Sequence, residues 1–376
     1  MNASVALFAI KWLIRDTFRQ AWSAGIFWLM SGVSVLCILL CLSVTVEGDV
    51  PLLPDGSENP EALPRIYGVE ASKAVAAIAA NGASRALGIW SVQVHPGTEP
   101  KKPLPFYSIE YQQVTSAKRH NVPIAGGKLT LAFGAIPVEL ARDRTTAVRS
   151  IECVLAGWVA DAAGLLLALV FTAGFLPSFL HPAAVAVLLT KPVPRWSLLV
   201  GKYLGVLTFV AVQIFIFLSG TWLALGVRTG VWDPTYFVCL PLLLLHFSVF
   251  FSFSAMLAVL TRSTVVCTFG SILFWLLCWG MNYGRHVALS APDLQNESGL
   301  FSFATGMGYW LLPKPLDIHS ILVSSLQADN LFSRVVDTQL LTQRDAWHPE
   351  LSVLASLLTG LVLLGIAAYE FVNTDY

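Results

Sequence analysis

Long apolar stretches, separated by short polar connections, are the feature that most constrains how this chain folds. A helix of about 20 apolar residues spans the hydrocarbon core of a bilayer. Backbone hydrogen bonds cannot be made to lipid, and a helix satisfies them within the segment. The sequence therefore predicts an all-α integral membrane protein with six transmembrane helices, over residues 23–46, 154–176, 203–227, 236–260, 265–283 and 351–371.

The composition agrees with this class of protein. Of the 376 residues, 56% are hydrophobic and 12% are charged, whereas a soluble domain carries about 25% charged residues. The formal net charge is zero, which argues against a nucleic acid as a partner. The six cysteines show no C-x-x-C spacing and no pairing in the polar segments. We interpret them as packing residues rather than disulfides or metal ligands.

Residues 1–22 precede the first predicted span and have the pattern of an amphipathic helix. Lys11, Arg15 and Arg19 recur at every fourth position and form a basic stripe beside an apolar face. A helix of this kind lies in the headgroup region of the cytoplasmic membrane surface. One interpretation is a basic anchor that only sets the orientation of the chain. The apolar run that follows is too long for a signal peptide, so we interpret it as a retained span.

The segment between the first and second spans, residues 47–150, has the composition of a soluble domain. Alternating pieces at 89–94 and 128–133 predict strands, and residues 70–80 have a helical pattern. No run in this segment is long enough to cross a bilayer. We interpret it as an external α+β domain, which is followed by the second to fifth spans within residues 151–283.

The segment before the last span, residues 284–350, is also predicted to be external. It contains a short apolar and aromatic stretch at 308–313, followed by residues with helical spacing. These features predict short helices, which either stay outside or re-enter the membrane where protein shields their backbone. Residues 351–376 then form the sixth span and a short cytoplasmic tail.

The connection between the second and third spans, residues 177–202, is basic and contains four prolines. Pro177 and Pro182 end the incoming helix, residues 183–189 form two helical turns, and two further prolines turn the chain back. Short connections rich in Lys and Arg are cytoplasmic, so this elbow and both termini lie inside. The external turn at 228–233 has one cation, and the segments assigned to the inside carry Lys11, Arg15, Arg19, Lys191, Arg195, Lys202 and Arg262.

The second half of this elbow, LLTKPVPRWSLLVGKYLG at residues 188–205, resembles the loop after the second span of ABC-2 type permeases. Those proteins are the membrane subunits of ABC exporters. The chain departs from their pattern at His181, Ala183 and Ala186, where the family often has glutamate or glycine. The order of the spans, with a large external first loop, is also similar. The family pattern is kept at Leu188, Leu189, Pro192, Pro194, Arg195 and Lys202.

The resemblance implies a permease subunit of an ABC exporter in the plasma membrane, the inner membrane in bacteria. It implies two kinds of partner, which are cytoplasmic ABC ATPase subunits and a second permease subunit, identical or homologous. The basic helix at residues 1–22 then packs near the ATPase, and Arg195 pairs with a carboxylate of that partner or with a lipid phosphate. The elbow residues expected to couple the chain to the ATPase are Leu180, Ala183, Val187, Leu188, Pro192, Arg195 and Lys202.

The chain carries no motif of an enzyme or of a nucleotide-binding protein. The phosphate-binding pattern G-x-x-x-x-G-K-[ST] does not occur, and neither does H-E-x-x-H or G-x-S-x-G. We therefore expect no catalytic residue, no metal ligand and no cofactor in this chain. ATP and Mg are expected to bind to the partner ATPase instead.

Three polar residues within the predicted spans, Asp161, Gln213 and His246, are candidates for a transport path. Each also has a structural interpretation. Asp161 lies near the outer end of its span and can face water or a neighbouring helix. Gln213 and His246 lie at comparable depths, so a hydrogen bond between them would explain both without a role in transport.

Two functions remain open from the sequence. The scarcity of charge along the spans favours an exporter whose substrate is apolar or amphipathic. The alternative is a membrane-anchored receptor or assembly factor, whose external domain binds a partner without transport. Co-purification of an ATPase subunit would distinguish the two, because only the exporter needs one.

Reporter fusions test the predicted topology. Fusions after Val50, Asn296 and Tyr376 should report outside, outside and inside, because positive charge retains short connections on the cytoplasmic side. An inside signal at Asn296 would remove either the fifth span or the turn at Arg262 from the topology.

Overall fold

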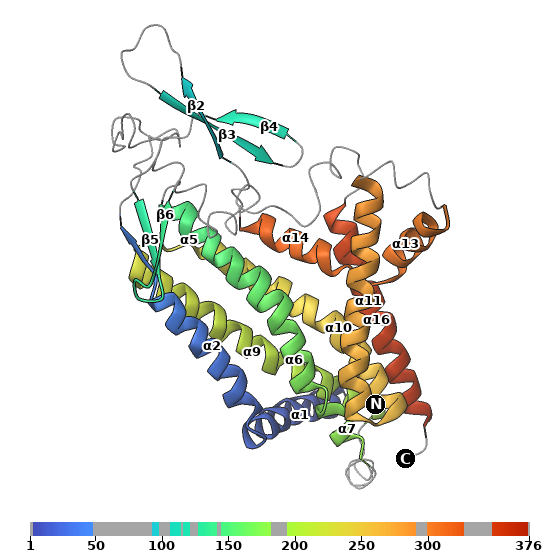
Figure 1. The fold of residues 1–376 in the computed structure, drawn as a ribbon. Coiled ribbons are helices and arrows are strands. Elements are labelled where there is room, and N and C mark those ends of the chain that lie inside the picture. Colours follow the sequence, from blue (N-terminus) through green and yellow to red (C-terminus); the bar gives the residue numbers. More distant parts are fainter. Residues whose placement is uncertain are drawn as a thin grey trace.

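Helices account for most of the described chain in the computed structural model, and they gather into one bundle (Figure 1). Both ends of the chain lie at one end of this bundle, and the strands lie at the other. The structure describes residues 3–47, 92–97, 106–113, 116–120, 127–140, 144–181, 194–290, 299–326 and 348–374.

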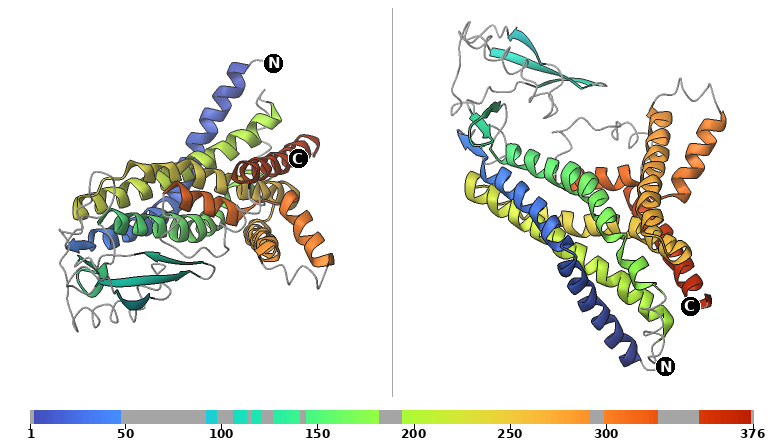
Figure 2. Two further views of the ribbon diagram at one scale, coloured as in Figure 1. Left: turned by 90° about the horizontal axis from the view of Figure 1, so that it is seen from above. Right: turned by 60° about the horizontal axis from the view of Figure 1, so that its bottom comes forward.

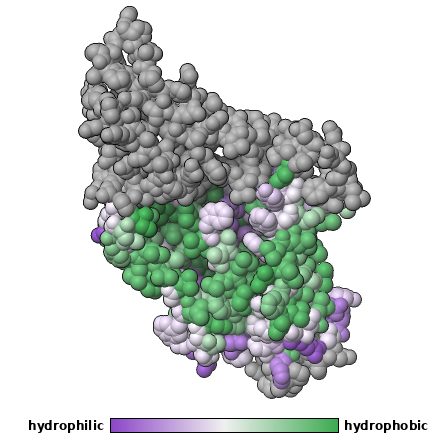
Figure 3. Space-filling model, viewed as in Figure 1, coloured by the Kyte–Doolittle hydropathy of each residue, from purple (hydrophilic) through white to green (hydrophobic). Residues whose placement is uncertain are grey.

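The bundle has the surface of a membrane protein. Hydrophobic residues cover the middle of the face shown in Figure 3, and hydrophilic residues gather below them, at the end where the termini lie. The helices Ala6–Ser23 and Ile26–Leu42 form one candidate span if they are taken together, with an angle of 71° between them. Within the described ranges, five helical stretches are long and apolar enough to span a membrane: Ala147–Phe179, Arg195–Thr229, Pro234–Thr261, Thr264–Val287 and Pro349–Asn373.

Breaks and changes of winding divide these stretches into shorter elements. The second predicted span, for example, is part of a rod in which an α-helix, a π-helix and another α-helix follow one another directly. The helical elements are α1 (Ala3–Ser23), α2 (Ile26–Leu42), α5 (Arg144–Cys153), the π-helix η1 (Val154–Gly164), α6 (Leu165–Thr172), α7 (Phe175–Phe179), α9 (Arg195–Thr229), the 3-10 helix η2 (Pro234–Val238), α10 (Cys239–Thr261), α11 (Thr264–Ser290), α13 (Gly299–Leu311), α14 (Pro315–Ser325) and α16 (Pro349–Asn373).

The first predicted span, residues 23–46, is longer than the helix that forms there. Gly25 has a φ of 74°, in the left-handed region that glycine adopts readily, and it separates α1 from α2. At the other end, Thr45–Glu47 forms strand β1 instead of continuing the helix. The apolar residues before this strand therefore belong to a helix of 17 residues.

Two other boundaries also differ from the prediction. The fifth span, predicted at 265–283, continues as α11 to Ser290, because Asn282 and His286 in its later turns contact protein rather than lipid. The third span was predicted to begin at residue 203, but its helix, α9, already starts at Arg195, directly after Pro194. Proline suits this position because it lacks the N–H that a first turn leaves unpaired. Part of the predicted elbow is therefore helical.

The strands form two antiparallel sheets of three strands each. One has the order β1-β5-β6, with β5 at Gly127–Leu131 and β6 at Ile136–Leu140. The other has the order β2-β3-β4, with these strands at Val92–Gly97, Phe106–Gln113 and Ser116–His120.

Both predicted strands overlap observed ones, with shifted ends. The strand predicted at 89–94 overlaps β2, and the one predicted at 128–133 overlaps β5. β5 ends earlier than predicted because Ala132 and Phe133 have φ values of 51° and 57°, which turn the chain into β6. The predicted helix at 70–80 lies outside the described residues.

Asp233 organises the turn between α9 and α10. Its Oδ1 accepts hydrogen bonds from the backbone N and the hydroxyl of Thr235, at 3.0 and 2.6 Å, at the start of η2. Arg149 Nε of α5 donates to Asp233 Oδ2 at 2.7 Å. Burial opposes ionisation of Asp233, but these hydrogen bonds outweigh it and hold the pKa of the carboxyl below its ordinary value. The turn is thereby tied to α5.

α1 packs closely against the first part of α9, and the two helices run side by side in Figure 2. Two glycines of α9, four residues apart, make this contact possible. A Cβ added at Gly201 would lie 2.7 Å from Leu13 Cδ1, and one added at Gly205 would lie 2.5 Å from Thr17 Oγ1. Small residues at this spacing allow two helix backbones to approach closely.

Replacing Gly205 by valine should separate α1 from α9 and lower the free energy of unfolding by about 1–3 kcal/mol, as overpacking does. The measurement is unfolding of the purified protein in mixed micelles. Gly365→Val is the matched control, because Gly365 is also helical and a Cβ there has no atom within 4 Å. Equal effects of the two substitutions would contradict the close contact.

Candidate functional site

A chain of hydrogen bonds joins α1, α7 and α9 at the end of the bundle that holds both termini. Lys202 of α9 is buried, and its Nζ donates to Asp16 Oδ2 at 3.2 Å and to Gln20 Oε1 at 2.8 Å. Gln20 Nε2 in turn donates to Ser178 Oγ of α7 at 2.8 Å. We call these four residues the Lys202 junction. The predicted elbow leaves from α7 and returns at α9, so both of its ends are attached to this junction.

The other elbow residues named from the sequence have different surroundings. Leu180 is fully buried in the bundle core, so its side chain is packed inside the chain and does not offer a surface to a partner. Arg195 Nη1 donates to the backbone oxygens of Val372 and Thr374, at 3.1 and 3.5 Å, and thus binds the chain's own C-terminal segment. Ala183, Val187, Leu188 and Pro192 lie outside the described residues.

The basic stripe of α1 faces away from the bundle. Lys11, Arg15 and Arg19 are exposed, whereas Leu13 and Thr17, on the opposite face, are buried against α9. The stripe is therefore free to contact a membrane surface or another protein, as the amphipathic pattern predicts.

A buried acid links three helical elements of the bundle, η1, α10 and α14. Asp161 of η1 lies with its Oδ1 2.5 Å from His246 Nδ1 of α10 and its Oδ2 3.2 Å from His319 Nδ1 of α14. Asp161 and His246 are buried, and His319 is partly exposed. Gly157 makes room for this arrangement, because a Cβ there would lie 2.9 Å from His319 Cε1. We call these three side chains the Asp161 cluster.

The predicted pair of Gln213 and His246 is wrong. Gln213 instead accepts a hydrogen bond from Ser31 Oγ at 3.3 Å and donates to Phe27 O at 3.5 Å, both towards α2. His246 faces Asp161, because comparable depth in two helices does not determine how each helix is rotated. His319 was not identified from the sequence, although it lies in the stretch with helical spacing.

Gln213 also lines a cavity of about 90 Å³ between α2, the η1–α6 rod, α9 and α10. Its walls are mainly apolar and include Met30, Ala160, Leu165 and Phe247. Ser34 and Gln213 are its polar residues. A cavity with such walls favours an apolar group over a charged one, because an ion placed there would lose its hydration without finding a partner.

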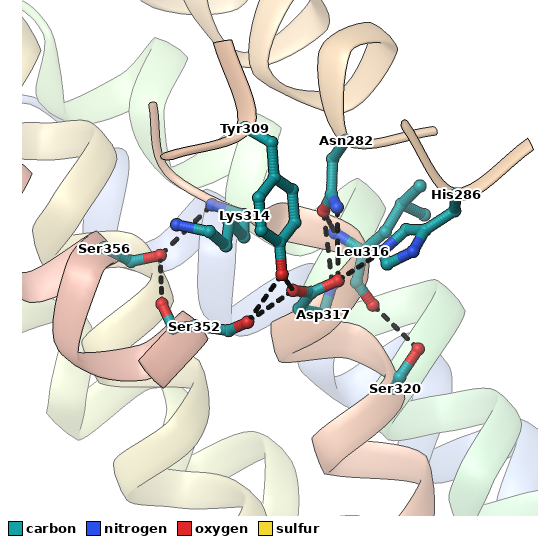
Figure 4. Close-up of polar contacts among 9 residues, drawn as sticks. All are labelled: Asn282, His286, Tyr309, Lys314, Leu316, Asp317, Ser320, Ser352 and Ser356. Atoms are coloured by element: carbon teal, nitrogen blue, oxygen red, sulfur yellow. Dashed lines mark hydrogen bonds and ion pairs between the residues drawn. The ribbon is translucent and has the colours of Figure 1, made fainter. Parts of the chain in front are cut away.

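A second buried acid, Asp317, holds α14 against three other helices (Figure 4). Its Oδ1 accepts a hydrogen bond from Asn282 Nδ2 at 3.1 Å and lies 2.6 Å from His286 Nε2, both on α11. Its Oδ2 accepts from Tyr309 of α13 at 2.7 Å and from Ser352 of α16 at 2.5 Å. We call these residues the Asp317 cluster.

Asn282 and Ser356 complete this region by binding backbone groups. Asn282 Oδ1 accepts from the backbone N of Leu316 and of Asp317, at 3.0 and 3.3 Å, in the first turn of α14. Ser356 Oγ accepts from the backbone N of Lys314 at 3.1 Å. These donors are the ones that the start of a helix leaves unpaired. The sequence placed Asp317 in an external segment, so its partners on the spans were missed.

The six cysteines are buried and none is in a disulfide, and their burial agrees with their interpretation as packing residues. Among the described residues, no group of three or more His, Cys, Asp and Glu side chains is arranged to hold a metal ion. The polar clusters therefore consist of hydrogen bonds between helices.

Family membership indicates what this helical bundle does. Residues 18–376 match the family model described as ABC-2 family transporter protein. This chain belongs to the ABC-2 transporter family. No curated protein and no solved structure matches it. As an ABC-2 family protein it is a multi-pass membrane protein and a permease of an ABC-type transporter, and the family implies a partnership with an ABC ATPase.

Removing the carboxylate of the Asp161 cluster should destabilise this permease strongly. Asp161→Ala should lower the free energy of unfolding by about 3–5 kcal/mol, because it leaves buried polar partners without their counterpart. Unfolding in mixed micelles measures the effect. Gln213→Leu is the comparison and should cost less than about 1.5 kcal/mol, because its hydrogen bonds are long and uncharged. Similar losses in both variants would contradict this assignment.

Proposed function

We propose that this chain is the permease subunit of an ABC exporter, which moves an apolar or amphipathic compound across the inner membrane of a bacterium. Separate cytoplasmic ATPase subunits bind ATP and Mg and supply the energy. The chain itself is not an enzyme and binds no cofactor. A second permease subunit, identical or homologous, completes the path across the membrane.

The observation that carries this proposal is the Lys202 junction, taken with family membership. An elbow attached at both ends to α1, α7 and α9 cannot be displaced without moving these helices. α9 continues across the bundle for 35 residues. A push on the elbow by an ATPase is therefore transmitted along α9 to the opposite end of the bundle.

Two further features support the direction and the substrate class. The exposed cations of α1 lie at the end that holds both termini, which supports a cytoplasmic location for that end. The described strands β1 to β6 lie at the other end (Figure 1), which supports the proposal that residues 47–150 are an external α+β domain. The apolar cavity between α2, α9 and α10 favours an apolar group in the substrate. No observation favours the alternative of a receptor or assembly factor.

An added charge in the elbow tests the coupling. Val187→Asp should abolish substrate-stimulated ATP hydrolysis by the reconstituted complex, because it places a carboxylate in an apolar contact with the ATPase. Arg195→Ala should weaken the coupling less, because an exposed charge contributes only about 0–1 kcal/mol. Membrane abundance is measured in parallel.

Ser263→Asp is the matched control for this experiment. It adds the same charge in the turn between α10 and α11, at the same end of the bundle, where aspartate can replace serine in capping the next helix. Stimulated hydrolysis should be retained in this variant. Normal stimulation in Val187→Asp would show that the elbow does not transmit the movement.

A further inference from the structure

Two cationic side chains meet at one aromatic ring where α11, α13 and α14 come together. Arg285 Cζ lies 3.8 Å and Lys314 Nζ lies 4.7 Å from the ring centroid of Tyr309. Both also lie near Trp310, with centroid distances of 5.8 and 5.5 Å. Aromatic rings stabilise such cations partly, but they do not accept the hydrogen bonds that the cations can donate.

These cations have donors without acceptors. The side chain of Lys314 is 0% exposed, and its Nζ has no hydrogen-bond partner among the described residues. The same holds for the buried Nη1 of Arg285. A buried donor without a partner is unfavourable, and more so when it is charged. Burial lowers the pKa of Lys314 to about 8, so it is still protonated at neutral pH.

The nearest acid does not satisfy these donors. Asp317 lies close enough to interact electrostatically with Lys314, but its two oxygens already face Asn282, His286, Tyr309 and Ser352. Its single charge balances only one of the two cations. Within the part of the chain that the structure describes, the site therefore has one positive charge in excess and unpaired donors, which is what an anion requires.

The surface beside these cations is apolar and exposed. Trp310 and Leu311 are 50% and 64% exposed, and Phe303 and Met307 on the preceding turns of α13 are also exposed. In a membrane protein, exposed apolar side chains contact lipid chains, and aromatic residues gather at the level of the head groups. A ligand at this place meets cations at one end and an apolar helix face at the other.

We propose that Arg285 and Lys314 bind the phosphate of an anionic lipid, whose acyl chain lies along the exposed apolar face of α13. Arginine offers paired N–H groups that match two phosphate oxygens, and lysine adds a point charge. The phosphate supplies acceptors for the two unpaired donors and neutralises the excess charge. This site lies away from the Lys202 junction and does not depend on the proposed transport function.

Native mass spectrometry of the full chain in detergent tests the site. Phosphatidylglycerol should bind more tightly than phosphatidylcholine with the same acyl chains. The variant Arg285→Gln/Lys314→Met should lose this preference, with a fall of about tenfold or more in affinity for phosphatidylglycerol, because charge-assisted hydrogen bonds are removed. Its affinity for phosphatidylcholine should fall much less, because the phosphate of that lipid is already balanced by its own quaternary ammonium group.

Two matched variants accompany this measurement. Arg228→Gln removes an exposed arginine at the same end of the bundle, whose Nε donates to Val44 O, and should keep the preference. Arg285→Lys retains the charge but not the paired N–H groups, so it should keep the preference for phosphatidylglycerol, with a smaller fall in affinity than Arg285→Gln. If the double variant does not fold, Arg285→Gln alone is used, and a fall of about tenfold is again expected.

Three results would overturn the proposal. One is unchanged affinity for phosphatidylglycerol in the folded charge-removing variant. Another is an equal fall in affinity for both lipids, which would show that the cations contact the phosphodiester common to the two lipids and do not select a lipid with a net negative charge. The last is inorganic phosphate alone binding as tightly as phosphatidylglycerol with the same dependence on Arg285, because the ligand would then be free phosphate and not a lipid.

Discussion

A carboxylate buried among apolar helices must find its hydrogen-bond donors on other helices, and this requirement determines how α14 is held. The Asp161 cluster joins α14 to η1 and α10 through His319. The Asp317 cluster joins it to α11, α13 and α16. His319 and Asp317 are only two residues apart, so the two clusters together tie this short helix to η1, α10, α11, α13 and α16. Hydrophobic packing alone, which has no direction, would not select this single arrangement.

The opposite end of the bundle uses close backbone contact as well as polar bonds. Gly201 and Gly205 let α1 approach α9, and Lys202, between them, donates to Asp16 and Gln20. Steric fit and hydrogen bonding thus act on the same two turns of α9. For an ABC-2 permease this matters, because the elbow begins from the neighbouring α7 and ends at α9.

Hydropathy predicted the order of the spans and a number, six, that agrees with the five or six candidate spans of the described residues, because hydropathy depends on residue type and length alone. It did not predict how each helix is rotated. Gln213 was therefore predicted as the hydrogen-bond partner of His246, whereas His246 faces Asp161. The extension of α11 was missed for a related reason, since His286 lies beyond residue 283, where the predicted span ended, and the sequence does not show that α14 covers it. The spacing of Gly201 and Gly205 was visible in the sequence and would have indicated a close contact with another helix, but not that this helix is α1.

The π-helical winding of η1 has a consequence for the length of this segment. A π-helix closes its hydrogen bonds over one more residue than an α-helix does, and such turns act as local insertions. In an α-helix each residue advances the direction of a side chain by about 100°. Deleting one residue between Val154 and Gly164 would therefore relax the winding and turn Asp161 relative to the preceding helix α5. The number of residues in this stretch, as well as their identity, is under constraint.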